Sequence, residues 1–132
     1  MLFRSFEVAE TYLFDSLYSR GSTFSTWLMG GADRKLIAYY SGGRVASQCR
    51  RMMRTFDEEK FPYLHEEKEG AHSRAEITKA RAVFIKTSAS HRGVTHRYNE
   101  LRDCLYASTL RRRLKSGWFD RKNGARTLDP RK

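Results

Sequence analysis

The chain has 132 residues, 39% of them hydrophobic, which allows one domain with a modest core but not two full domains. Its 26 Lys and Arg against 15 Asp and Glu give a formal net charge of +11. This charge favours a polyanionic partner, because each phosphate that a protein neutralises releases counterions. An anionic membrane surface is the weaker alternative, since no apolar run approaches the roughly 20 residues of a spanning helix.

Charge divides the chain into four blocks. Residues 1–33 sum to −2 and are rich in Phe, Leu and Tyr, whereas residues 34–56 hold six basic side chains and no acidic one. Residues 57–70 sum to −4, and residues 71–132 hold 16 basic and five acidic groups. The contacts with a polyanion are therefore expected in the second and fourth blocks.

The first predicted element is an amphipathic helix within an N-terminal extension, residues 1–31. Apolar residues recur there at three- and four-residue steps. They are Leu2, Phe6, Ala9, Leu13 and Leu17. A wide apolar stripe in a small basic protein is more often core than a docking surface. If the stripe docks, the acidic balance of the segment favours protein over RNA as the partner, through Phe6, Leu13 and Leu17. The same acidic groups make the segment a poor cleavable transit peptide.

A second helix is expected from Asp33 through residue 56, bent or split at Gly42 and Gly43. The acidic stretch 57–70 contains Pro62 and is predicted to form a loop.

After the acidic loop, Ser73 and Glu76 have the spacing of a capping box, which predicts a short helix over residues 73–79. The β-branched run AVFIKT, residues 82–87, predicts an extended segment. A last helix is expected over residues 95–114, followed by a basic tail, residues 119–132, that orders on a partner. The fold class expected from these elements is mainly α: an extended multi-helix protein with irregular basic segments and a small core.

No constellation of reactive groups indicates an enzyme or a cofactor. The sequence lacks the glycine-rich phosphate loops and the G-x-S-x-G nucleophile motif. Its four His have no motif spacing to Cys or carboxylates, so no metal site is expected. Cys49 and Cys104 stand 55 positions apart, and two free, partly buried thiols in a reducing compartment are favoured over a disulfide.

Basic residues alternate with aromatic and small polar residues in SHRGVTHRY and LRRRLKSGWFDRK. Arg can bind a phosphate with two hydrogen bonds, Gly allows close approach of the backbone, and aromatic rings can stack on unpaired bases. This combination predicts an RNA-binding surface.

Two stretches resemble a known family. They are the segment Asp33-Arg34-Lys35-Leu36-Ile37-Ala38-Tyr39-Tyr40 and the set Thr87, Arg92-Gly93-Val94, His96-Arg97-Tyr98 and Arg102. This pattern is similar to the zinc-free form of the fourteenth protein of the small ribosomal subunit. The resemblance covers residues 32–118 and implies an extended helical protein of the subunit head, bound to rRNA and to neighbouring head proteins, without catalysis or a small-molecule substrate. The terminal extensions are of the kind that mitochondrial ribosomes have, so the mitochondrial matrix is the expected location.

The residues expected to bind RNA are named from their types and from this resemblance. In the middle of the chain they are Arg34, Lys35, Arg50, Arg51, Arg92, Gly93, Arg97, Tyr98 and Arg102. Toward the C-terminus they are Arg111, Arg112, Arg113, Lys115, Trp118, Arg121 and Lys122.

Two alternatives stay open. One is an accessory subunit or adaptor of a mitochondrial respiratory complex, because Leu17-Tyr18-Ser19-Arg20 is similar to the Leu-Tyr-Arg signature of such adaptors. The other is a free protein that binds single-stranded nucleic acid.

Overall fold

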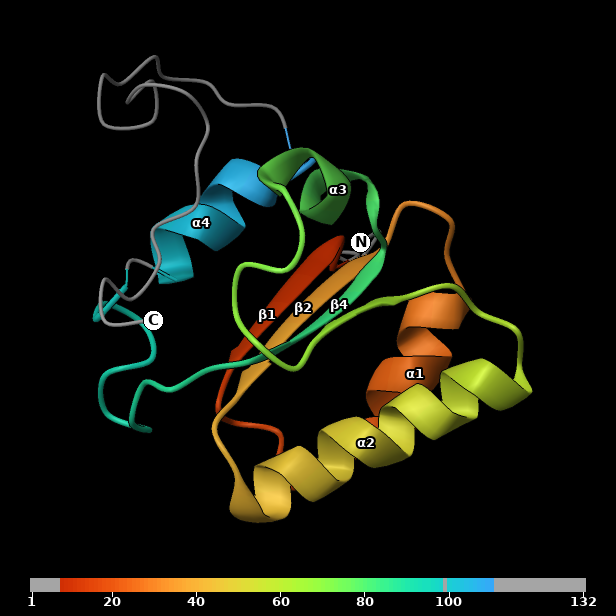
Figure 1. Cartoon of the computed structure of the whole chain (residues 1–132). Helices are drawn as coiled ribbons and strands as arrows, with labels where there is room; N and C mark the ends of the chain where they lie inside the picture. The colour runs from red at the N-terminus through yellow and green to blue at the C-terminus, as the bar shows by residue number, and fades with distance from the viewer. Residues whose placement is uncertain (1–7, 99, 111–132) are drawn as a thin grey trace, which may run out of the picture.

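The computed structural model describes residues 8–98 and 100–110 and shows an α/β fold with four parallel strands and four helices (Figure 1). The prediction of a mainly α, extended multi-helix protein was wrong. The strands are β1 (Glu10–Phe14), β2 (Lys35–Tyr40), β3 (Leu64–Glu66) and β4 (Ala82–Lys86). The helices are α1 (Gly21–Met29), α2 (Gly43–Glu58), α3 (Arg74–Lys79) and α4 (Glu100–Ala107).

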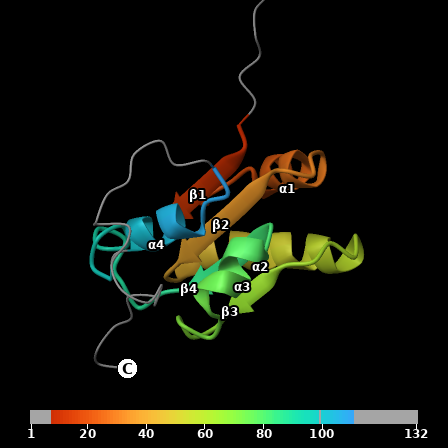
Figure 2. The ribbon, with the colours of Figure 1, turned by 90° about the horizontal axis from the view of Figure 1, so that it is seen from above.

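The strand order in the sheet is β1-β2-β4-β3, so β2 and β4 are central and β1 and β3 are edges. Helices α1 and α2 contact each other on one face, and α3 and α4 contact each other on the opposite face (Figures 1 and 2). A parallel sheet covered on both faces needs strands that are apolar on both sides. The central strand KLIAYY is buried at all six positions, which meets this requirement.

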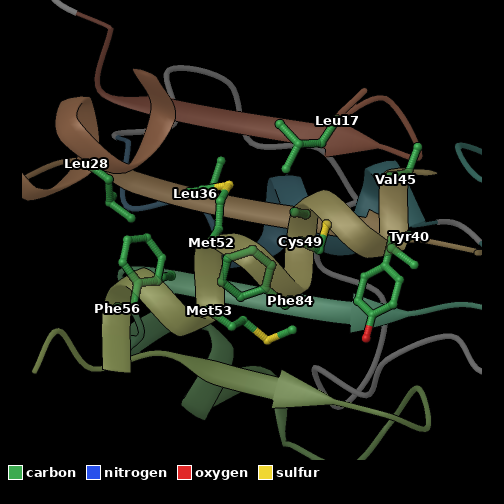
Figure 3. Close-up of a cluster of buried hydrophobic side chains, with 13 residues drawn as sticks. Leu17, Leu28, Leu36, Tyr40, Val45, Cys49, Met52, Met53, Phe56 and Phe84 are labelled. Atoms are coloured by element: carbon green, nitrogen blue, oxygen red, sulfur yellow. The ribbon is translucent and has the colours of Figure 1, made fainter. Parts of the chain in front are cut away.

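The first core lies between the sheet and the helices α1 and α2. Side chains from alternate positions of β2 and β4, such as Leu36 and Phe84, meet the buried stripe of α2 (Figure 3). That stripe recurs every three or four residues, as expected for a helix that packs on a sheet. It consists of Val45, Ala46, Cys49, Met52, Met53 and Phe56.

The second core lies on the other face, where Ile37 and Tyr39 of β2 and Val83 and Ile85 of β4 point. Helix α3 contributes Ile77, and α4 covers the remaining area through Cys104 and Ala107, among others. The alternation of side chains along the two central strands therefore separates the two cores cleanly.

The expected N-terminal helix is absent from the described residues. Leu13 lies in strand β1, and Leu17 is 1% exposed in the first core, so neither presents a docking surface. The Ser/Thr-rich stretch that follows, GSTFSTWLM, forms α1. Over so short a segment, apolar residues at three- and four-residue steps do not distinguish a helix from a strand followed by a loop.

Five further segments can be compared with their predictions. The helix expected from Asp33 begins only after Gly42, because the residues before it form β2. The last helix ends at Ala107, short of the predicted residue 114, and within the acidic stretch residues 64–66 form β3. The capped helix α3 and the extended run β4 are confirmed.

Candidate functional site at the carboxyl edge of the sheet

The carboxyl ends of all four strands lie at one edge of the sheet, which we call the carboxyl edge. It is formed by residues 15–20, 41–44, 67–70 and 86–98. The adjacent strands β2 and β4 lead into helices on opposite faces, α2 and α4. Open α/β sheets bind ligands outside the carboxyl ends of the strands at such a switch point. The carboxyl edge is therefore the candidate site.

Exposed charge at this edge is almost entirely positive. The basic side chains exposed there are Arg20, Arg44, Lys68, Lys86, Arg92 and Arg97. The exposed acidic one is Glu67, whose carboxylate accepts a hydrogen bond of 3.1 Å from Lys86. His91 and His96 are also exposed. This distribution is suited to an extended anion.

The opposite edge, which we call the amino edge, has the reverse balance of exposed charge. The segments that lead into the strands, residues 30–34, 57–63 and 79–81, expose four acidic and two basic side chains. The acidic ones are Asp33, Asp57, Glu58 and Glu59. The folded part is thus polarised along the strand direction, with its positive end where the sheet topology predicts a ligand.

Helix α2 begins at the carboxyl edge after two glycines. Gly43 has φ +57°, in the left-handed region that favours glycine, and Gly42 and Gly43 have nothing within 4 Å of the position of a Cβ. The first turn of α2 has neither a side-chain cap nor an acidic residue. Its free N–H groups and the positive end of the helix dipole lie beside Arg44.

The loops of the edge are joined by one buried carboxylate. Asp15 is 4% exposed and has φ +49°, a conformation that Asp adopts more readily than most residues. Its Oδ1 accepts a hydrogen bond of 2.8 Å from the Ser41 amide, and its Oδ2 accepts one of 2.8 Å from the Ser41 hydroxyl. Nδ1 of His91 lies 3.2 Å from Oδ2 and 3.4 Å from the Tyr18 hydroxyl. Asp15 thus holds three loops together.

Two of the side chains predicted to contact RNA are buried. Lys35 is 2% exposed, and its ammonium donates to the carbonyls of Ile77, Thr78 and Ala80 at 2.5–3.0 Å. Burial lowers the pKa of Lys35 to about 8. The ring of Tyr98 is 4% exposed in the second core and cannot stack on a base.

Two predicted arginines are engaged with other protein groups. Arg34 lies at the amino edge, where it donates to the Trp27 carbonyl at 2.7 Å and its guanidinium lies 5.9 Å from the ring centroid. Arg102 lies 3.7 Å from Asp103 and is largely buried. Neither belongs to the carboxyl edge.

The remaining predicted contacts in the described residues are placed on the surface or in a turn. Arg92 and Arg97 are exposed at the carboxyl edge, and Arg50 and Arg51 are exposed on α2. Gly93 is buried, and its carbonyl accepts from the amides of His96 and Arg97, so it shapes the turn that presents both arginines.

Phe6 and the predicted contacts beyond residue 110 lie outside the described residues. The latter are Arg111, Arg112, Arg113, Lys115, Trp118, Arg121 and Lys122.

A depression of about 400 Å³ lies between α1 and α2, away from the carboxyl edge. Its walls are hydroxyl-bearing side chains such as Ser22 and Thr26, the thioethers of Met29 and Met52, and Arg51. None of its lining residues belongs to the segments of the carboxyl edge, so the topology does not favour it as the main site.

No family model, curated protein or solved structure matches this chain in the comparisons with known proteins. Within residues 8–98 and 100–110, no group of three His, Cys, Asp or Glu could hold a metal ion. The helices of that same part of the chain include none long and apolar enough to cross a membrane.

Sequence reasoning missed Asp15, His91, Arg20 and Arg44 as members of the edge. Asp15 and His91 are 76 positions apart, and only the parallel pairing of the strands brings them together. The signal that could have found them is the short polar stretch after each apolar run, since such stretches share one edge when the strands are parallel.

Proposed function

We propose that this protein binds RNA, with the sugar-phosphate backbone lying across the carboxyl edge of the sheet. The observation that carries the proposal is the segregation of exposed charge, six basic side chains against one acidic at this edge, and its coincidence with the topological switch point. Arg44, Arg92 and Arg97 would bind phosphates by paired hydrogen bonds. The open backbone at Gly42 and Gly43 would allow the RNA chain to approach the first turn of α2.

The residues beyond the described part add to the same chemistry. Residues 111–132 hold nine basic and two acidic side chains, so +7 of the net charge of +11 belongs to them. Nine basic side chains in one chain with a basic edge would add to the attraction of the protein for a polyanion and increase its salt dependence.

The test measures binding of a fluorescent single-stranded RNA to the full chain by anisotropy, over a series of salt concentrations. The triple variant Arg44→Gln, Arg92→Gln, Arg97→Gln is expected to bind more weakly and to lower the slope of log K against log salt by about two, near 0.7 for each phosphate contact. The matched control is Lys60→Gln with Lys79→Gln at the amino edge, which should leave the slope unchanged. Equal slopes for both variants would contradict the proposal.

Assignment to the small subunit of a mitochondrial ribosome stays a prediction that rests on the resemblance in sequence. It is tested by sedimentation of the tagged protein in a gradient, where the protein should move with the small subunit and leave it at high salt. Its presence only in fractions of a membrane complex would favour the adaptor alternative, although Leu17-Tyr18-Ser19-Arg20 lies in the loop between β1 and α1 and not in a helix.

A further inference from the structure

His91 differs in kind from the charged groups around it. Guanidinium, ammonium and backbone N–H groups are hydrogen-bond donors without an acceptor. The side chain of His91 is 58% exposed, and Nε2 has no hydrogen bond to any group that the structure describes. A neutral imidazole has one donor and one acceptor nitrogen, so the role of Nε2 depends on which nitrogen holds the proton.

Asp15 determines which ring nitrogen of His91 holds the proton. Its carboxylate is buried and accepts hydrogen bonds, and Nδ1 of His91 lies 3.2 Å from its Oδ2. The proton of the neutral ring is therefore on Nδ1, which leaves the lone pair on Nε2. The two hydrogen bonds from Ser41 hold Asp15 in place, and the Tyr18 ring packs edge-on against His91 with centroids 6.2 Å apart. The imidazole is thus fixed in both orientation and tautomer.

The same contacts place His91 in the middle of the edge. Ser41, which shares Asp15 with His91, is followed directly by Gly42 and Gly43 at the start of α2. Arg92 is the next residue of the chain and is exposed. A backbone held by arginines and by the N-terminus of α2 would pass beside Nε2.

We propose that Nε2 of His91 accepts a hydrogen bond from the ribose 2′-hydroxyl of the bound strand, so that the carboxyl edge prefers RNA to DNA. The inference rests on the proposed function and names the chemical group that the site distinguishes. Phosphate contacts are the same for both nucleic acids, whereas a 2′-hydroxyl exists only in RNA and can donate to an acceptor.

The experiment compares a single-stranded RNA with the 2′-deoxy strand of the same sequence, each bound to the full chain. The wild-type protein is expected to favour RNA about fivefold, the worth of one net hydrogen bond. His91→Phe removes the acceptor and should reduce that ratio to about one while the affinity for DNA is kept. His96→Phe is the matched control, because His96 is exposed on the same loop and has no carboxylate partner, and it should keep the preference.

Asp15→Asn provides the sharper test, because it keeps the imidazole and changes its tautomer, while the amide nitrogen turns from acceptor to donor toward the Ser41 hydroxyl as well. The Asn amide would donate to Nδ1, which moves the proton to Nε2 and turns the acceptor into a donor. We expect the RNA preference to be lost, with thermal melting showing a folded protein. A preference that persists in both Asp15→Asn and His91→Phe would overturn the inference, as would equal wild-type affinity for RNA and DNA. Absence of binding to either strand at low salt would instead refute the proposed function.

Discussion

Lys35 holds the C-terminal end of α3 against the sheet. Its ammonium donates to three carbonyls, and a methionine there would keep the length of the side chain but leave those acceptors buried without a donor. We expect Lys35→Met to lower the free energy of unfolding by about 2 kcal/mol or more. Urea denaturation checks this value. Lys79→Met, at an exposed position, should change it by less than about 0.5 kcal/mol, and equal losses in the two variants would contradict the role of Lys35.

Glu100 gives the fold a dependence on pH. Its side chain is fully buried at the start of α4, where one oxygen accepts from the Tyr98 amide and the other, Oε1, has no hydrogen-bond partner. Burial raises the pKa of this carboxyl, so the native state holds its proton at pH values where the unfolded chain has lost it. Stability from Glu100 is therefore present below the unfolded pKa, near 4.5, and declines as pH rises through the higher native pKa.

Glu100→Gln should remove this dependence, because the amide does not ionise. Relative to the wild type, the variant is expected to gain stability as pH increases from 5 to 8. The measurement is the urea midpoint of both proteins at the two pH values, at constant ionic strength. A difference between the proteins that stays constant with pH would show that Glu100 does not titrate in this range.

At the scale of elements, α3 is short and depends on its cap. Ser73 and Glu76 form a capping box, in which the Ser73 hydroxyl accepts from the Glu76 amide and the Glu76 carboxylate accepts from the Ser73 amide at 2.7 Å. Ser73→Ala should cost about 1 kcal/mol of unfolding free energy. Ser47→Ala is the control, because Ser47 is exposed in the interior of α2 and alanine favours a helix there. Chemical denaturation measures the free energy of unfolding of both variants. An equal loss in the two would show that the effect comes from removing a hydroxyl and not from removing the cap.

Elements with a local signal could be predicted from the sequence, and elements defined by distant contacts could not. The capping box of α3 and the β-branched run of β4 are read within a few residues. The run KLIAYY was assigned to a helix, because a continuous apolar stretch has no period that separates a buried strand from a buried helix. Its strand character comes from pairing with β1 on one side and β4 on the other, which are distant in sequence.

The candidate site shows the same division. The expectation that basic residues bind RNA is a local one and stays a prediction; the structure places two of them, Arg92 and Arg97, exposed at the carboxyl edge. Burial of Lys35 and Tyr98 depends on elements that fold over them from elsewhere in the chain, so residue type alone could not reveal it.

For the whole molecule, charge is shared unequally between the folded part and the C-terminal segment. Residues 8–110 hold 16 basic and 12 acidic side chains, whereas residues 111–132 hold nine and two. Non-specific attraction to RNA should therefore depend mainly on residues 111–132. The orientation of the bound strand should instead depend on the carboxyl edge.

Replacing Arg111, Arg112 and Arg113 with Gln tests this division. We expect weaker binding with a salt slope lower by about two, while the preference for RNA over DNA stays as in the wild type. Anisotropy titrations with both strands at several salt concentrations provide the measurement. Loss of the preference in this variant would show that the segment, and not the edge, recognises the strand.

Each of the two cores contains one cysteine. Cys49 of α2 is fully buried in the first core, where burial raises the pKa of its thiol to about 12, and Cys104 of α4 is buried in the second. Thiols react with alkylating reagents as thiolates that solvent can reach, so each should react only when its own layer of helices opens. The protein therefore contains a built-in reporter for each side of its sheet. Comparing the alkylation rates of the two cysteines, by mass spectrometry of the native protein, would reveal whether the layers separate together or one at a time.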